Sequence, residues 1–161
     1  MLTEKEIYDI LSEIPDPEIP VITIKDLGIL QRVEVSENSC IVFITPTYSG
    51  CPAMKMIEDQ IKEALAPHQI TNISVKLIYS PAWTTDWIST EAKEKLRTYG
   101  IAPPQHSSVD KGSILGKPKE LKCPQCNSKN TQMISQFGST ACKSLYKCLD
   151  CKEPFDYFKC I

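Results

Sequence analysis

Cys123-Pro124-Gln125-Cys126 and Cys148-Leu149-Asp150-Cys151 form two CxxC pairs with 21 residues between them. A CxxC turn can direct two sulfur atoms towards one metal ion, so two such turns provide four thiolates in a closed tetrahedral arrangement. Pro124 fixes φ within the first turn, and Asn127 tolerates the left-handed conformation that such turns often require. The spacing therefore predicts a zinc-ribbon-like module over residues 123–161.

This module has about 40 residues, too few to bury the apolar surface needed for folding, so a structural metal ion is expected. Zinc suits four thiolates, but a mononuclear iron or an iron–sulfur cluster is an alternative, because thiolates also bind iron. Cys142 could be an additional ligand or a reactive thiol beside Lys143, although a packed cysteine is the simpler interpretation. Cys160 is interpreted as a tail residue without a role. Four aromatic residues are available to cover the site, namely Phe137, Tyr146, Phe155 and Phe158.

The composition excludes several classes of protein. Eight cysteines among 161 residues, without a visible secretory signal, indicate metal or redox chemistry in the cytoplasm rather than a disulfide framework. The 18 basic and 20 acidic residues give a formal net charge of −2, which argues against nucleic-acid binding. No stretch approaches the roughly 18 to 20 apolar residues of a membrane span. We therefore expect a cytoplasmic protein with neither a nucleic-acid nor a membrane partner.

Residues 1–100 have the pattern of a small α+β domain. Three helices and three strands are expected from the apolar periodicity, over residues 3–14, 29–35, 40–45, 52–66, 73–79 and 90–99. The order α-β-β-α-β-α indicates a helix/sheet sandwich with helices on one face of a short mixed sheet. The proline-containing stretch 101–122 is expected to be a linker to the ribbon at 123–161.

Cys51 lies where a predicted strand turns into the second helix. Pro52 suits the first helical position, which would place Cys51 at the N-cap. There the free backbone N–H groups and the helix dipole would stabilise a thiolate, making Cys51 a metal ligand or a nucleophile. The alternative is a small buried residue at a tight turn. A Cys–His nucleophile is disfavoured, because no histidine has a suitable spacing.

A second candidate element is Asp16-Pro17-Glu18, where prolines hold two carboxylates in an extended segment that could face Cys51. Taken alone, this segment is also typical of a sequence that ends a helix and leaves its carboxylates solvated. Trp83 and Trp87 are interpreted as an aromatic anchor for the core or for a partner surface, with the core preferred. Cys40 is expected in the core.

Together, several motifs resemble the small α+β domain family associated with iron–sulfur cluster and metallocentre assembly: Asp16-Pro17-Glu18, Asp26-Leu27-Gly28, Ser49-Gly50-Cys51-Pro52 and Pro81-Ala82-Trp83. With the appended CxxC…CxxC module, the architecture resembles the D-subunit family of bacterial phenylacetyl-CoA epoxidase systems. The resemblance covers nearly all of residues 5–160 and includes Gly138–Lys143.

This resemblance implies an accessory role in phenylacetate degradation, with no enzymatic activity alone. It implies that Cys51, with Asp16 and Glu18, handles iron or an iron–sulfur unit transiently for the di-iron oxygenase and iron–sulfur reductase subunits. Cys123, Cys126, Cys148 and Cys151 would hold structural zinc. One cysteine cannot enclose a cluster, so a homodimer or a site shared with a partner is expected. The alternatives are an iron-containing electron-transfer subunit and a structural subunit of the same complex.

Overall fold

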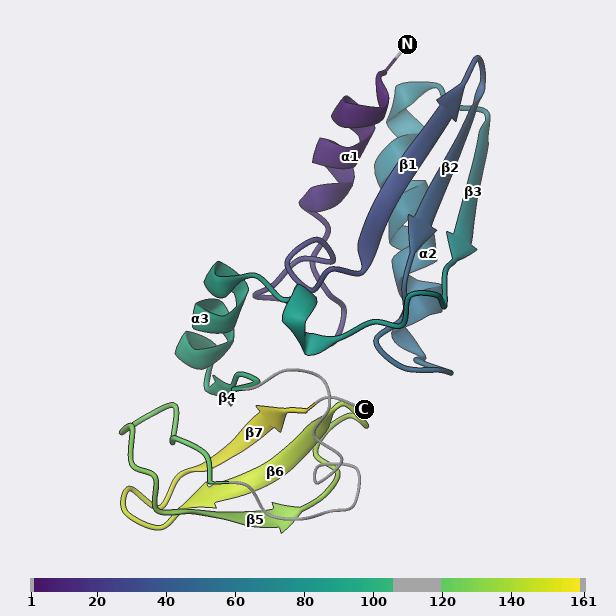
Figure 1. Ribbon diagram of the computed structural model, residues 1–161. Coiled ribbons are helices and arrows are strands. Elements are labelled where there is room, and N and C mark those ends of the chain that lie inside the picture. The colour runs from purple at the N-terminus through teal and green to yellow at the C-terminus, as the bar shows by residue number, and fades with distance from the viewer. Residues whose placement is uncertain (1, 106–119, 160–161) are drawn as a thin grey trace. The chain divides into compact units, whose positions relative to one another are not determined.

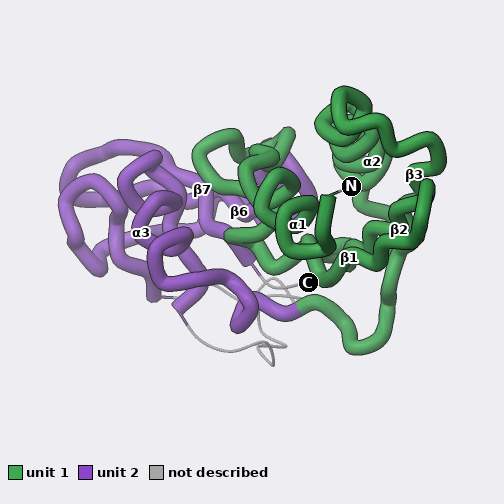
Figure 2. Tube along the Cα trace, turned by 90° about the horizontal axis from the view of Figure 1, so that it is seen from above, with its two compact units in different colours: residues 1–83 green, residues 84–161 purple. Residues whose placement is uncertain are grey.

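The computed structural model describes residues 2–105 and 120–159, and the chain divides into two compact units, residues 1–83 and 84–161 (Figure 2). The division comes earlier than the expected boundary at residue 100. The reason is that the third helix, α3 (Thr90–Tyr99), contacts strand β4 (Ile101–Ala102) of the second unit. Among the described residues, no helix has the length and apolar composition that crossing a bilayer requires.

The first unit begins with helix α1 (Glu4–Ser12), whose N-terminus is capped by Thr3 and Glu6. The Thr3 hydroxyl accepts a hydrogen bond from the Glu6 backbone N–H at 3.2 Å, and the Glu6 carboxylate accepts one from the Thr3 backbone N–H at 2.8 Å. This reciprocal capping box satisfies backbone donors that a helix terminus leaves unpaired. Ile7 and Leu11 are fully buried on its inner face.

A three-stranded mixed sheet forms the other layer of this unit, in the order β1-β2-β3. Its strands are β1 (Leu30–Ser36), β2 (Ser39–Ile44) and β3 (Asn72–Leu77); β2 is antiparallel to β1 and parallel to β3. Helix α2 (Ala53–Leu65), followed by the 3-10 turn η1 (Ala66–His68), connects the two parallel strands. Both α1 and α2 lie on one face of the sheet (Figures 1 and 2), which confirms the predicted fold class.

The core of this unit lies between that face and the helices. Alternate residues of β2, namely Cys40, Val42 and Ile44, are fully buried, because side chains alternate between the faces of a strand. The register places Leu77 of the edge strand β3 beside Ile44, yet Leu77 is 43% exposed. The apolar alternation in β3 is therefore only partly covered.

The second unit contains the short 3-10 turn η2 (Thr85–Trp87), α3 and a four-stranded sheet in the order β4-β7-β6-β5. The remaining strands are β5 (Thr131–Ser135), β6 (Lys143–Cys148) and β7 (Pro154–Phe158). Strands β6 and β7 therefore flank the second CxxC pair. Ile101 and Ala102 were expected to start a linker, but they form β4, because both are buried and pair with β7. The expected linker otherwise falls mostly on residues 106–119, outside the described residues.

The core of the second unit is small and aromatic. The rings of Tyr146 and Phe155 stack at a centroid distance of 5.9 Å, and Tyr157 meets Tyr146 edge-on at 6.0 Å. Cys123 and Cys148 are fully buried within the same cluster.

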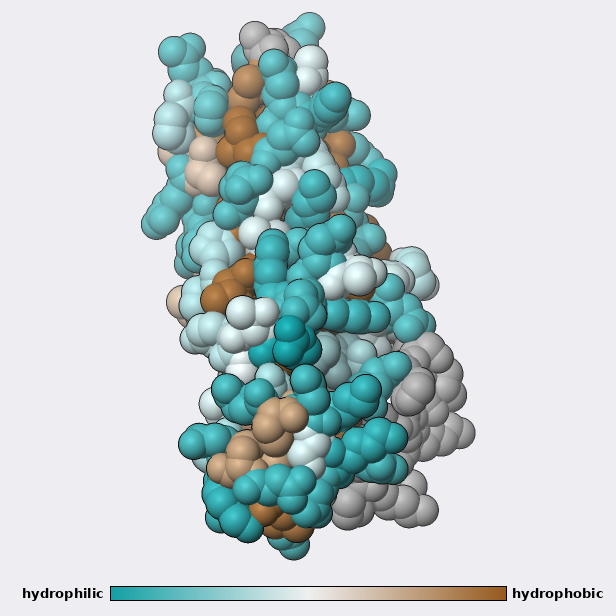
Figure 3. Space-filling model, turned by 90° about the vertical axis from the view of Figure 1, so that its left-hand side faces the viewer, coloured by the Kyte–Doolittle hydropathy of each residue, from teal (hydrophilic) through white to brown (hydrophobic). Residues whose placement is uncertain are grey.

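On the face of the molecule shown in Figure 3, hydrophilic residues predominate and hydrophobic residues form only small separate patches.

Candidate metal centre and the Cys51 site

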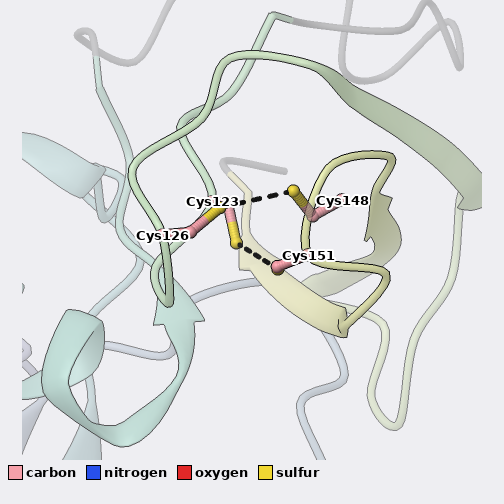
Figure 4. A group of neighbouring side chains, drawn as sticks. All are labelled: Cys123, Cys126, Cys148 and Cys151. Atoms are coloured by element: carbon pink, nitrogen blue, oxygen red, sulfur yellow. Dashed lines mark hydrogen bonds between the residues drawn. The ribbon is translucent and has the colours of Figure 1, made fainter.

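The four cysteines of the two CxxC pairs converge on one point (Figure 4). The Sγ atoms of Cys123 and Cys151 are 3.7 Å apart, those of Cys126 and Cys148 are 3.6 Å apart, and all four lie within 4.8 Å of one another. Within residues 2–105 and 120–159, this is the sole group of three or more Cys, His, Asp or Glu side chains gathered so closely. We refer to it as the cysteine quartet.

The geometry of the quartet fits a single tetrahedral ion. Zinc–sulfur bonds of about 2.3 Å in a tetrahedron place the sulfur atoms about 3.8 Å apart, close to the two observed distances. An iron–sulfur cluster would separate the sulfurs more widely, because its cysteine ligands are distributed over different iron atoms. The observed spacing therefore favours one ion, either zinc or a mononuclear iron.

The two turns share one backbone conformation. The Cys123 N–H donates to the Ser128 carbonyl at 2.8 Å, and the Cys148 N–H donates to the Glu153 carbonyl at 3.0 Å. The residue after each pair has a positive φ, 61° at Asn127 and 67° at Lys152. The left-handed conformation predicted at Asn127 is confirmed. Lys152 was missed, although its position directly after the second pair could have identified it.

Backbone N–H groups also stabilise the thiolate forms of Cys148 and Cys151, which are the forms that bind a cation. The backbone N–H of Cys151, with that of Asp150, lowers the pKa of Cys148 to about 7. At Cys151 the backbone N–H of Glu153 favours the thiolate, but burial and the neighbouring thiols outweigh it and raise the pKa to about 12. The thiols thus lose their protons unequally when only protein groups stabilise them. A divalent cation supplies the positive charge that allows four thiolates to coexist.

Cys142 lies apart from the quartet. It is buried, its Sγ lies 3.0 Å from the Thr140 hydroxyl oxygen, and its carbonyl accepts a hydrogen bond from the Lys159 N–H. These contacts are those of a packed cysteine. Cys160 lies outside the described residues. Of the aromatic residues expected to cover the site, Tyr146 and Phe155 do so, whereas Phe137 is 59% exposed and places its ring against the Lys159 ammonium at 4.3 Å.

Cys51 lies between β2 and α2, as expected, but in a different environment. Helix α2 begins at Ala53 with Pro52 at the N-cap, one residue later than predicted. The helix terminus was expected to stabilise the thiolate, with a small buried residue at a tight turn as the alternative; Cys51 is only 9% exposed, and its pKa is raised. Burial is the largest cause, and it outweighs the Ala53 backbone N–H and the Thr47 hydroxyl, which favour the thiolate.

Asp16 and Glu18 act on the same thiol. The negative charges of Glu18 and, more weakly, Asp16 add to the burial that raises the pKa of Cys51. The Asp16 carboxylate is buried and accepts hydrogen bonds from the backbone N–H groups of Glu18 at 2.9 Å and Ile19 at 2.8 Å. These bonds fix the turn that carries Glu18. The structure thus places both carboxylates near Cys51. These three groups are not gathered within 4.8 Å of one another, as the sulfur atoms of the quartet are.

The Glu18→Gln variant is expected to make Cys51 more reactive towards iodoacetamide at pH 8. Removing the negative charge lowers the raised pKa, and the thiolate is the reacting species. Since one pKa unit changes the thiolate fraction about tenfold below the pKa, we expect about a two- to tenfold faster reaction. Mass spectrometry of the Cys51 peptide measures the rate, with Glu37→Gln as the matched control. Equal rates in Glu18→Gln and wild type would show that the charge of Glu18 does not raise the pKa of Cys51.

Two families match the chain. The family described as "PaaD zinc beta ribbon domain" matches residues 107–159, and the family described as "Iron-sulfur cluster assembly protein" matches residues 4–77. The first match includes the quartet and the second includes Asp16, Glu18 and Cys51. The two families therefore correspond to two separate candidate sites.

Similar proteins cover the chain to different extents. An Escherichia coli K12 protein, named as the putative D-subunit of 1,2-phenylacetyl-CoA epoxidase, is 51% identical over 156 residues, which are 97% of this chain and 92% of that protein. The "Fe-S protein maturation auxiliary factor SufT" of Staphylococcus aureus USA300 is 41% identical over 80 residues, 48% of this chain and 90% of that protein. The first similarity includes the ribbon, whereas the second covers about half of the chain.

Solved structures support the fold of the N-terminal part. The structure titled "Domain of Unknown Function DUF59 from Bacillus anthracis" has a TM-score of 0.53 and 29% identity, covering 58% of this chain and 90% of that chain. The Thermotoga maritima protein TM0487 has a TM-score of 0.50 and 26% identity, covering 59% and 94%. Each of these structures therefore corresponds to little more than half of this chain.

Proposed function

Because this chain belongs to the D-subunit family of phenylacetyl-CoA epoxidase systems, we propose that it is an accessory protein that assists iron or iron–sulfur centre assembly in its partners. The partners are the di-iron oxygenase and iron–sulfur reductase subunits of such a system, and the chain performs no oxygenation itself. It acts in the cytoplasm, where reducing conditions keep cysteines as thiols. The match of residues 4–77 to iron–sulfur cluster assembly proteins supports this role.

The observation that carries the proposal is the Cys51 thiol with the carboxylates of Glu18 and Asp16 around it. Burial is the main reason that the thiol stays protonated, and the negative charges that add to this effect also attract a cation, whose binding releases the proton. The iron is cargo and not a resident cofactor. One thiolate leaves most coordination positions of iron open, so a second copy of the chain or the client supplies the remaining ligands.

The cysteine quartet has a different role in this proposal. It holds structural zinc that stabilises the second unit, as expected for four thiolates in a closed site. Its sulfur spacing also suits a mononuclear iron, which gives a second candidate function, electron transfer. Zinc thiolate is colourless and ferric thiolate absorbs visible light, so the spectrum of the purified protein, with its zinc and iron content, separates these two roles.

The test of the proposed function is co-expression with the oxygenase and reductase subunits, comparing wild type with Cys51→Ser. We expect Cys51→Ser to lower the iron and acid-labile sulfide of the partner subunits, and their epoxidase activity, more than tenfold. The metal of the quartet should remain. Cys40→Ser is the matched control, because Cys40 is also buried in the first unit but lies within β2. Normal iron content in partners matured with Cys51→Ser would reject the proposal.

A further inference from the structure

Asp150 lies between two members of the quartet, Cys148 and Cys151, yet its carboxylate points to the other turn. The hydroxyl of Ser128 donates a hydrogen bond to one carboxylate oxygen of Asp150. The Asn130 side-chain amide donates to the other oxygen at 2.8 Å. The Ser128 hydroxyl oxygen in turn accepts the Asn130 backbone N–H at 3.0 Å. Both carboxylate oxygens are therefore engaged by the segment that follows the first CxxC pair.

Ser128 is itself part of the first turn. Its carbonyl accepts the Cys123 N–H at 2.8 Å, and its own N–H is directed at the Cys126 sulfur. A backbone hydrogen bond from the Leu149 N–H to the Asn130 carbonyl, at 2.8 Å, runs beside the carboxylate contacts. The two turns are thus joined by protein groups alone, independently of any ion.

We propose that Asp150 is a positioning residue that locks the two CxxC turns at the sulfur spacing of one ion and slows the release of that ion. Release of a four-coordinate ion requires one turn to swing away from the other. The Asp150 contacts with Ser128 and Asn130 oppose this motion. This inference deepens the structural role proposed above for the quartet, because a locked ion is resident and not cargo.

The test measures transfer of Zn²⁺ from the zinc-loaded full-length chain to excess 4-(2-pyridylazo)resorcinol, followed by absorbance. Loss of outer hydrogen-bond partners commonly weakens metal binding about 10- to 100-fold, so we expect Asp150→Ala to release zinc about 10- to 100-fold faster than wild type. Glu91→Ala is the matched control. It removes an equal charge from helix α3 of the same unit, and the exposed Glu91 carboxylate belongs to neither CxxC turn. Its release rate should stay within about twofold of wild type.

Ser128→Ala removes the hydroxyl that donates a hydrogen bond to Asp150 and leaves the sequence of the second CxxC turn unchanged. This variant tests the proposal if Asp150→Ala fails to fold. Because the two residues act through one contact, the double variant should release zinc no more than about twofold faster than Asp150→Ala. Wild-type release from both single variants overturns the proposal, as does equal acceleration by Glu91→Ala. The assay contains no partner subunit, so its failure is distinguishable from failure of the Cys51 experiment.

Discussion

Cys148→Ser is expected to remove the metal ion and unfold the second unit. Cys148 is fully buried within the aromatic cluster of Tyr146 and Phe155, and it is the thiol whose pKa the backbone lowers most clearly. The variant would place a hydroxyl there, with only three thiolates left for the ion. A structural zinc ion contributes on the order of 10–16 kcal/mol in small modules, comparable with the whole stability of a domain.

The measurements are metal per chain and near-ultraviolet circular dichroism, which reports on the packed tyrosines. We expect less than one tenth of the wild-type metal and loss of the aromatic signal from the second unit. The helices α1 and α2 should persist, because they belong to the other unit. Cys142→Ser is the matched control and should retain its metal, since Cys142 lies apart from the quartet. A full complement of metal in Cys148→Ser would refute the assignment of this ligand.

The features that were predictable from the sequence are those set by local spacing. A CxxC turn determines the positions of its own two sulfurs, so the quartet could be identified from residue spacing alone. The left-handed conformation at Asn127 and the capping box at Thr3 likewise depend on residues within one turn. The α+β class followed from periodicity, because helices and strands alternate in a recognisable order.

The features that escaped prediction depend on contacts between distant segments. The strand β4 exists because Ile101 and Ala102 pair with residues more than 50 positions later. The Ser128 hydroxyl donates a hydrogen bond to Asp150, which lies 22 residues later in the sequence. The pKa of Cys51 was predicted from its nearby helix terminus, but burial and the carboxylates of Glu18 and Asp16 outweigh that local effect. Such contributions become visible only once the chain is folded.

Trp83→Ala is expected to destabilise the first unit by about 3–5 kcal/mol, the usual cost of truncating a buried tryptophan. Trp83 is 7% exposed, and its Nε1–H donates a hydrogen bond to the Leu27 carbonyl at 2.7 Å. That bond joins the segment after β3 to the turn before β1. Gly28 in this turn has a φ of 73°, and its N–H donates to the Lys25 carbonyl at 2.8 Å. The tryptophan therefore fixes two segments that are 56 residues apart.

Two further variants separate the hydrogen bond from the packing of the ring. Trp83→Phe retains most of the aromatic volume but leaves the buried Leu27 carbonyl without its donor, so a loss of about 1–3 kcal/mol is expected. Trp87→Phe is the control, because Trp87 is half-buried, and its cost should stay below about 1 kcal/mol. Urea unfolding followed by far-ultraviolet circular dichroism gives the three values. Equal losses for Trp83→Phe and Trp87→Phe would show that the bond to Leu27 contributes nothing, and the stability of this region would then rest on ring packing alone.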